Sequence, residues 1–377
     1  GFQIISQPIQ SIMKNILVID KNLDDYGAKL LAKHFVVFLF FFFSGLFFYL
    51  ILKKLIDNES FCILGSILYL TYPYLFGQSM FSPKDVPFMS VWLLCTYISF
   101  ILFEKIIGEN NLKLKYVIIF SICSAYLLSI RIAGSLIFLQ YLITFIIFLN
   151  IYKISFIKFL TNYYKHFLIF IIFLVFFIFL FYPILWINPL LLIQTFEINA
   201  AHFNNVGTTT LGEIMYSKDL PSTYLLIWFS VKLPLIILLG ILILPFTEKK
   251  IFKDKKKGVF FGTLLLSVSS ILLILIFKKV HLYDEIRQVM FLVPLIFIIG
   301  LTSLFNLSKK FFYLIVPITV LFFIGENIKI NPYQYVWFNL PSRVLDLNKN
   351  FELEYQGISG REISKHLNTL KTQELCI

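Results

Sequence analysis

The chain has 377 residues, of which 59% are hydrophobic, 18% aromatic and only 14% charged, and its mean hydropathy is +0.84. Soluble domains are about 45–50% apolar and about 25% charged, so this composition excludes a soluble globular, disordered, collagen-like or disulfide-rich chain. The net charge of +12 does not indicate nucleic-acid binding, because the lysines fall in short loops rather than along a basic stripe. We therefore expect an all-α, multi-pass integral membrane protein.

A transmembrane helix needs about 20 mostly apolar residues. Ten segments meet or approach this length, and they predict a transmembrane bundle over 35–325. In chain order they are 35–52, 61–76, 86–103, 116–130, 132–150, 166–186, 223–246, 259–277, 288–305 and 311–325. The N-terminal segment 1–34, a longer loop at 187–222 and a polar tail at 326–377 lie outside these segments.

The orientation follows from the loops. One alternate set of loops carries sixteen Lys and Arg residues and the other carries six. Because cytoplasmic loops are enriched in Lys and Arg, the richer set, which includes 249–257, is predicted to be cytoplasmic. The 1–34 segment, the 187–222 loop and the tail, including 331–339, are then predicted to lie on the outer side.

The outer loops contain compact polar motifs in which we expect the function to lie. In Ser82-Pro83-Lys84-Asp85-Val86-Pro87, the Lys84–Asp85 pair stands at the predicted start of a membrane helix, where the helix dipole favours a carboxylate. Such a pair at the bilayer rim suits recognition of a phosphate beside a reacting hydroxyl. The structural alternative is a helix cap followed by a lysine that extends to the membrane surface.

Two arginines stand at other outer helix ends. Arg131 is the only arginine before residue 287, and a guanidinium can hold a phosphate through two parallel hydrogen bonds. Arg287 follows Tyr283 and Asp284 in a second polar motif. The structural alternatives are a topology marker for Arg131 and a self-contained interfacial ion pair for Arg287. We expect Asp85, Arg131 and Arg287 to converge on one water-accessible cavity.

The histidines predict no zinc site, because His34 and His202 lack a second histidine at ligand spacing. No metal ligands are therefore assigned, and a divalent cation is left open as a cofactor. Lys232 is the one clear ionisable residue in the middle of a predicted membrane segment.

Together these motifs resemble the membrane glycosyltransferases of the dolichyl-phosphate-mannose protein mannosyltransferase type, family 39, and most closely a bacterial branch of that superfamily. The resemblance runs from about residue 24 to 365. The family's motifs are N-P-K-D-x-P-F at 82–88, R-I-G-G at 131–134, Y-P-x-x-W-x-N-P at 182–189, D-L-P-x-x-Y at 219–224, T/L-P at 233–234, N-P-Y-Q-x-V-Y-F-N at 331–339 and E-L-D-Y-W-G at 352–357. This chain departs from them at Ser82, Ala133, Trp337, Glu354 and Gln356. The family's Y-D-G-W-R-H motif falls at 283–288, where Glu285, Ile286 and Gln288 differ from it.

The resemblance implies a GT-C fold, in which outer-loop helices cover a multi-helix bundle. It implies transfer of a sugar from a polyprenyl-phosphate-linked donor to a lipid, glycan or protein acceptor, here on the periplasmic side of a bacterial inner membrane. Asp85 would be the site carboxylate, Lys84, Arg131 and Arg287 would contact the phosphate, and Tyr283 and Asp284 would support them.

The family also carries an acidic residue in its first outer loop. None of Asp20, Asp24 and Asp25 lies in a recognisable motif, so that carboxylate is expected upstream of Gly1. Two alternatives remain open. One is a transporter or flippase of lipid-linked sugars, and the other is a non-catalytic assembly subunit with a GT-C-like fold.

Overall fold

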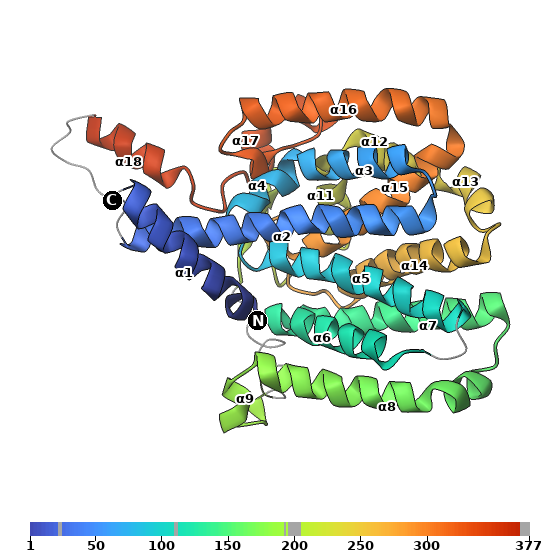
Figure 1. Ribbon diagram of the computed structural model, residues 1–377. Helices are drawn as coiled ribbons and strands as arrows, with labels where there is room; N and C mark the ends of the chain where they lie inside the picture. Colours follow the sequence, from blue (N-terminus) through green and yellow to red (C-terminus); the bar gives the residue numbers. More distant parts are fainter. Residues whose placement is uncertain (22–24, 109–111, 192–193, 195–204, 370–377) are drawn as a thin grey trace.

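The computed structural model describes residues 1–21, 25–108, 112–191, 194 and 205–369 (Figure 1). The first half contains α1 (Phe2–Lys21), α2 (Asp25–Leu55), α3 (Glu59–Thr71), α4 (Pro73–Phe81), α5 (Asp85–Gly108), α6 (Leu114–Ile130), η1 (Ile132–Ser135), α7 (Leu136–Tyr152), α8 (Phe156–Phe181) and α9 (Ile184–Ile187). The second half contains β1 (Gly207–Thr210), β2 (Glu213–Tyr216), α11 (Tyr224–Lys232), α12 (Leu235–Leu242), α13 (Leu244–Ile251), α14 (Lys255–Phe277), η2 (Arg287–Leu292), α15 (Val293–Leu307), α16 (Lys309–Lys329), η3 (Gln334–Val336), η4 (Pro341–Val344), α17 (Leu347–Asn350) and α18 (Gly360–Thr369).

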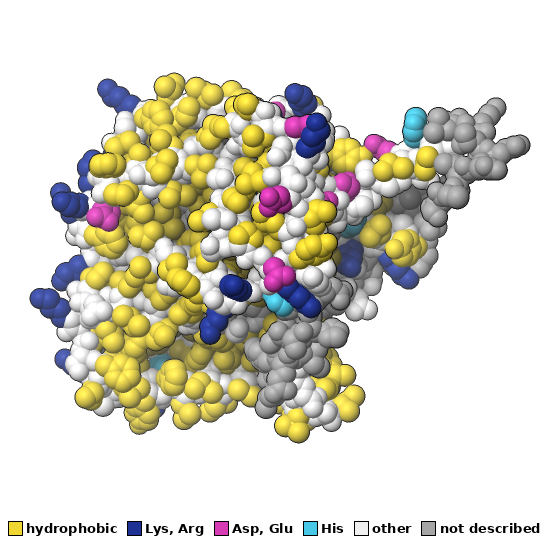
Figure 2. Space-filling model, turned by 180° about the vertical axis from the view of Figure 1, so that it is seen from behind, with side chains coloured by type: hydrophobic (Ala, Val, Ile, Leu, Met, Phe, Trp, Pro, Cys, Tyr) yellow, Lys and Arg dark blue, Asp and Glu magenta, His cyan; other side chains and the backbone are white. Residues whose placement is uncertain are grey.

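The protein is a multi-pass α-helical membrane protein. Within the described ranges, seven helices are long and apolar enough to cross a bilayer, or eight if the bent pair α3–α4 is one span. The helices run side by side in one bundle (Figure 1). Figure 2 shows hydrophobic side chains over most of one outer face, which is the surface expected of a bundle surrounded by lipid.

Three of the ten predicted spans are not single long helices. The 61–76 segment breaks at Tyr72–Pro73, where α3 and α4 meet at 60°. The 223–246 segment divides into α11, α12 and the start of α13, and α12 follows Pro234. Proline lacks an N–H group and disfavours helical backbone at the residue before it, so both breaks have a local cause. The third segment, 116–130, lies in α6, which has 17 residues.

The structure contains more helix near the N-terminus than the sequence predicts. The sequence predicts an outer loop at 1–34, whereas the described residues there lie in α1, which ends at Lys21, and in the first turns of α2, which begins at Asp25. The stretch from Ala28 to Ala32 contains Ala, Lys and Leu, which favour helix without requiring burial. The helix therefore continues beyond the apolar segment from which the prediction began.

The centre of the bundle is the η2–α15 segment. In its most apolar stretch 94% of the residues are buried, whereas only 6% are buried in the corresponding stretch of α8, at the edge of the bundle. η2 packs on α5, and α15 packs on α12 and α14. The side chain of Arg287, the first residue of η2, is therefore held by the most densely packed part of the protein.

The break between α11 and α12 exposes backbone carbonyls, and two residues from distant segments satisfy them. Tyr72, at the α3–α4 break, donates its hydroxyl to the Lys232 carbonyl at 2.7 Å. Asn339 donates its backbone N–H to the Val231 carbonyl at 2.9 Å, and its side-chain amide to the carbonyls of Ser230 (2.6 Å) and Leu233 (2.9 Å). Unpaired carbonyls are costly inside a bilayer, so these bonds make the broken helix tolerable there.

The two sets of loops lie at opposite ends of the bundle (Figure 1). The loops around Lys54, Lys153 and Lys253 are at one end, whereas the starts of α5 and η2 and the end of α6 are at the other. At this second end the antiparallel β1–β2 hairpin turns at Leu211 and Gly212, both of which have positive φ. The described part of the 187–222 loop thus contains this hairpin and the last residue of α9.

Candidate functional site

Asp85, Arg131 and Arg287 meet at one point, as their positions in the sequence predicted. The Asp85 carboxylate is ion-paired with the Arg131 guanidinium. Its second oxygen lies 3.8 Å from Arg287 Nε and accepts a hydrogen bond from the Ser82 hydroxyl at 3.1 Å. The three side chains are 11%, 26% and 20% exposed, so the centre is accessible from one side. The shared water-accessible cavity expected at this point stays a prediction.

Backbone geometry explains why the first two charges lie together. Asp85 is the first residue of α5, where the positive end of the helix dipole favours a carboxylate. Arg131 follows the last residue of the neighbouring α6, where the negative end of that dipole favours a cation. The Arg131 guanidinium also lies 5.7 Å from the centre of the Phe88 ring.

Arg287 is the first residue of η2, and the N-terminal end of a helix disfavours a positive charge. Nearby carboxylates compensate for this. Asp284 Oδ2 lies 2.7 Å from Arg287 Nη2. The rings of Tyr283 and Tyr355 lie 5.7 Å and 5.6 Å from the guanidinium carbon. Tyr283 and Asp284, the two predicted supporting residues, therefore both contact Arg287.

Asp284 belongs to the loop between α14 and η2, outside the membrane-length helices. Burial raises the pKa of its carboxyl, and the Arg287 guanidinium opposes part of this rise. The Asp284 N–H donates to Thr208 Oγ1 of the hairpin at 3.3 Å. The hairpin thus contacts the loop that carries Tyr283 and Asp284.

Lys84 does not join the cluster. Its side chain is exposed, and within the described part of the chain it has no ion-pair or hydrogen-bond partner. It adjoins Asp85 in the chain, so it adds a positive charge at the entrance of the centre. The side chains of Asp20, Asp24, Asp25 and His202, which the sequence also raised, lie outside the described residues.

Sequence reasoning missed one partnership in this region. Lys232 Nζ lies 3.0 Å from Glu285 Oε1, and both side chains are completely buried. The contact is an ion pair without hydrogen-bond geometry, because neither the ammonium nor the two carboxylate oxygens make a hydrogen bond to any described residue. The sequence indicates Lys232 as an ionisable residue within a membrane segment, but it does not indicate Glu285 as its partner.

Aromatic rings surround this ion pair. Lys232 Nζ lies 4.0 Å from the centre of the Phe338 ring, 5.3 Å from that of Tyr74 and 5.7 Å from that of Trp228. These contacts stabilise a cation that has left water. Burial raises the pKa of the Glu285 carboxyl, against the opposing effect of Lys232.

The backbone at Asp284 and Glu285 is unusual, since their φ angles are +54° and +63°. Left-handed backbone at a residue other than glycine costs about 1–2 kcal/mol. The family's motif has glycine at the position of Glu285. The loop therefore keeps a conformation that suits glycine while placing a carboxylate in the interior.

The tail brings Tyr355 to the site. Glu354 accepts hydrogen bonds from the backbone N–H groups of Gln356 (3.0 Å) and Gly357 (2.7 Å) and from the Tyr335 hydroxyl (2.6 Å). This turn holds the next residue, Tyr355, with its ring against Arg287. Gln78 Nε2 donates a hydrogen bond to the Tyr355 hydroxyl at 2.6 Å. The 352–357 motif thus orients a site residue.

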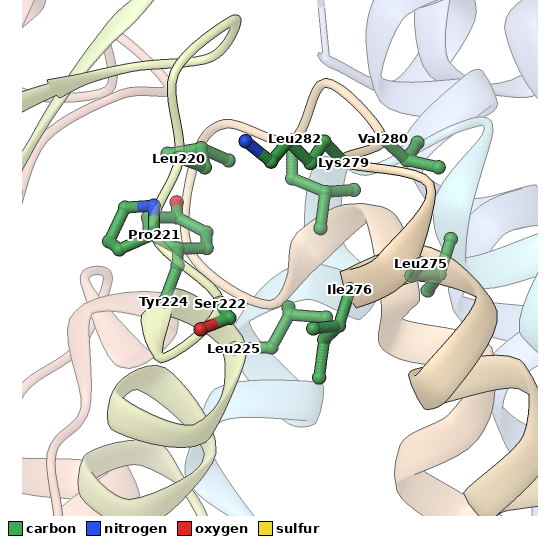
Figure 3. A pocket seen from close by; sticks show the side chains of 10 residues that line it. All are labelled: Leu220, Pro221, Ser222, Tyr224, Leu225, Leu275, Ile276, Lys279, Val280 and Leu282. Carbon is green, nitrogen blue, oxygen red and sulfur yellow. The ribbon is translucent and has the colours of Figure 1, made fainter.

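An apolar cavity of about 50 Å³ lies beside the loop between α14 and η2 (Figure 3). Its walls come from the residues around the start of α11 and the end of α14, including Pro221, Tyr224, Leu275 and Leu282. Lys279 is the one charged side chain among the residues that line it. Leu282 directly precedes Tyr283, so the cavity adjoins the loop that carries Asp284.

Within the described ranges, no group of three or more His, Cys, Asp or Glu side chains could hold a metal ion. A scan against protein-family models and searches of curated proteins and of solved structures found no match for this chain. The assignment of a function therefore rests on the geometry of the site and on the motifs of the sequence.

Proposed function

We propose that the protein is a glycosyltransferase that moves a sugar from a polyprenyl-phosphate-linked donor to an acceptor on the outer side of the membrane. The observation that carries this proposal is the contact of Asp85 with both Arg131 and Arg287, at one end of a membrane bundle and partly open to solvent. The resemblance of the outer motifs to family 39 and a GT-C fold supports the same assignment.

The charges of the site suit this reaction. The donor is a phosphodiester with one negative charge, and the leaving polyprenyl phosphate is a monoester that carries close to two. Catalysis of this transfer needs cations where the additional charge appears. Arg131 and Arg287 can each present two parallel N–H donors to phosphate oxygens, and the exposed Lys84 adds a third positive charge.

The two carboxylates have different roles in this proposal. Asp85 is bound to both arginines, so it fixes the two guanidinium groups relative to each other. Asp284 is the better proton acceptor for the attacking hydroxyl, because burial raises its pKa and a carboxylate with a higher pKa is the stronger base. The acceptor oxygen bonds to the sugar carbon as the bond from that carbon to the phosphate oxygen breaks.

The location of the site agrees with donors that remain in the membrane. The cluster lies at the end of the bundle opposite to the lysine-rich loops (Figure 1). The excess of Lys and Arg in those loops supports a cytoplasmic location for them, and hence a site on the periplasmic side of a bacterial inner membrane. The apolar cavity beside Leu282 offers a contact for the first part of a lipid chain.

The test uses the full-length protein in vesicles that contain native membrane lipids as acceptors and polyprenyl-phosphate mannose labelled in the sugar. We expect label to leave the polyprenyl carrier, and we expect Asp85→Asn to lower this rate by about 100-fold, the scale of a misplaced reacting group. Inorganic phosphate alone should compete weakly, because it lacks the lipid.

The alternatives predict different results in the same vesicles. A flippase would move label across the bilayer while the sugar stayed on its carrier. An assembly subunit would do neither. Either outcome with a folded protein, across glucose- and galactose-bearing donors as well as mannose, would contradict the proposed transferase.

A further inference from the structure

Arg287 and the buried residues next to it contain a group of polar atoms that make no hydrogen bond to a described residue, although Glu285 and Arg287 also take part in ion pairs. The Tyr74 hydroxyl, Gln78 Oε1, both oxygens of Glu285 and Arg287 Nε make no hydrogen bond to any described residue. The side chains of Tyr74 and Gln78 are completely buried, as is that of Glu285. We call these four residues, together with Tyr355, the Glu285 cluster.

The members of the cluster lie together, although they come from α4, the loop before η2 and the tail. Gln78 donates to the Tyr355 hydroxyl, and the Tyr355 ring lies over Arg287. Tyr74 and Glu285 both contact Lys232, at 5.3 Å from the ring centre and 3.0 Å from the carboxylate. The cluster therefore adjoins the Asp85 centre through Arg287, which belongs to both.

A buried polar atom without a partner costs about 1–3 kcal/mol, and folded proteins contain only a few. Such atoms are tolerated where a ligand or ordered water completes their hydrogen bonds. Here the atoms include acceptors (Gln78 Oε1 and the Glu285 oxygens) and donors (Arg287 Nε), and the Tyr74 hydroxyl can act as either. The matching ligand carries several hydroxyl groups, each of which is both donor and acceptor.

The position of Glu285 strengthens this interpretation. Its left-handed backbone would suit glycine, yet the chain places there a carboxylate that is ion-paired with Lys232 through one oxygen and accepts no hydrogen bond from a described residue through either. Adjacent hydroxyls of a hexose can donate to the two oxygens of one carboxylate, and the aromatic rings of Tyr74 and Tyr355 suit the C–H face of the same ring. Strain at a functional residue, maintained by the surrounding structure, is a recognised mark of a binding site.

We propose that the Glu285 cluster binds the hydroxyl groups of the transferred sugar and determines which sugar the protein accepts. This inference rests on the proposed function and adds to it a subsite for the hexose, separate from the phosphate contacts of Arg131. A phosphate at Arg131 and Arg287 would place its attached sugar next to Tyr355, whose ring lies 5.6 Å from the Arg287 guanidinium carbon.

The test compares two classes of probe on the purified full-length protein: bare polyprenyl phosphate, and polyprenyl phosphate carrying mannose, glucose or galactose. We expect at least one hexose to increase the affinity about tenfold or more over the bare lipid, the effect of one or two additional hydrogen bonds. Glu285→Gln should abolish this increase, while the affinity for bare polyprenyl phosphate stays the same.

Because Glu285→Gln leaves Lys232 without its counter-ion and can unfold the protein, Tyr74→Phe is the decisive variant. It removes a hydroxyl that lacks hydrogen-bond geometry to any described residue, so the thermal midpoint should fall no more than it does for the control variant below. We expect an affinity about five- to tenfold lower for the preferred sugar-bearing lipid only. Tyr126→Phe is the matched control, because Tyr126 is also a buried tyrosine with an unpartnered hydroxyl, and its ring packs on Phe181, away from the cluster.

The outcomes separate the two proposals. If the wild-type protein binds all probes equally, the sugar subsite is wrong and the phosphate centre stands. If it binds no probe, both are wrong. If Tyr74→Phe weakens bare and sugar-bearing lipids alike, or if Tyr126→Phe has the same effect as Tyr74→Phe, the hydroxyl has no specific role in sugar recognition and the subsite is again overturned.

Discussion

Arg131 tests whether the site recognises phosphate by shape or only by charge. Lysine keeps the positive charge but lacks the planar pair of N–H donors. We therefore expect Arg131→Lys to weaken binding of polyprenyl phosphate by about 10- to 100-fold, the scale of a charge-assisted hydrogen bond. The measurement is a titration of the purified protein with the lipid.

Arg343→Lys is the matched control for this change. Arg343 is also ion-paired with a carboxylate, that of Glu326, and is 30% exposed, close to the 26% of Arg131. It lies outside the proposed site, so lipid affinity should not change. Equal losses in the two variants would show that Arg131 acts only through stability.

Lys84 should behave differently, because its side chain is exposed and unpaired within the described residues. A solvent-exposed charge acts at a distance and is screened over about 8 Å at physiological ionic strength. We expect Lys84→Ala to weaken donor binding at low salt and to have no effect near 1 M salt. The control is Lys218→Ala, since Lys218 is an exposed lysine in the 187–222 loop. A Lys84 effect that persists at high salt would contradict this role.

At the level of single residues, the sequence predicted the ion-paired centre but not the buried pair. Asp85, Arg131 and Arg287 stand at apparent helix ends, and ends at the same membrane face are brought close by packing. The partnership of Lys232 and Glu285 depends on the left-handed turn at Asp284 and Glu285. No residue pattern predicts that turn, because the glycine that would normally indicate left-handed backbone is absent.

Among the helices, Asn339 is the residue on which the broken α11–α12 segment depends. It donates hydrogen bonds to three backbone carbonyls at that break, those of Ser230, Val231 and Leu233. Asn339→Ala removes the two bonds that the side-chain amide donates and leaves their carbonyls unpaired, at about 1–3 kcal/mol each. It also removes the bond that Asn339 Oδ1 accepts from the Ser342 N–H at 3.3 Å. We expect a clearly lower thermal midpoint in detergent, and no change for Asn348→Ala, whose side chain is exposed. An unchanged midpoint for Asn339→Ala would mean that water replaces these bonds.

Glycine sets the distance between α12 and α15. A Cβ atom on Gly240 would stand 2.3 Å from the Gly300 carbonyl oxygen, which no side-chain adjustment can relieve. Small residues at such crossings let membrane helices approach closely. We expect Gly240→Ala to separate the helices and lower the thermal midpoint. Gly325→Ala should be neutral or stabilising, because the added methyl group meets nothing within 4 Å and alanine favours helix.

The helices also show the limit of reading spans from hydropathy. The apolar segments 61–76 and 223–246 carry enough hydrophobic residues to cross a bilayer, and hydropathy alone treats each as continuous. Pro73 and Pro234 break them, and each break is completed by a residue from a distant segment: Asn327 donates to the Thr71 carbonyl at 2.7 Å, and Asn339 bonds the carbonyls before Pro234. Prolines mark the breaks in the sequence, whereas the partners that make the breaks stable are visible only in the fold.

For the molecule as a whole, the distribution of lysines and the position of the site make one joint prediction. The lysine-rich loops and the Asp85 centre lie at opposite ends of the bundle (Figure 1), and Figure 2 shows several Lys and Arg side chains along one edge. Because positive loops tend to remain in the cytoplasm, we expect the site to face outward. Under the proposed function, a donor assembled in the cytoplasm would then cross the bilayer before the transfer.

Cysteine labelling of intact cells measures this orientation. In a background where Cys62, Cys95, Cys123 and Cys376 are replaced, Lys253→Cys reports the lysine-rich end and Val344→Cys the end that carries the site. Both positions are exposed, and Val344 is 89% exposed, so accessibility of the side chain does not limit the reaction. A membrane-impermeant maleimide should label Val344→Cys in intact cells and Lys253→Cys only after permeabilisation. The reverse pattern would place Asp85, Arg131 and Arg287 in the cytoplasm and contradict transfer on the outer side. Labelling of both in intact cells would contradict the placement of the two ends on opposite sides of the membrane.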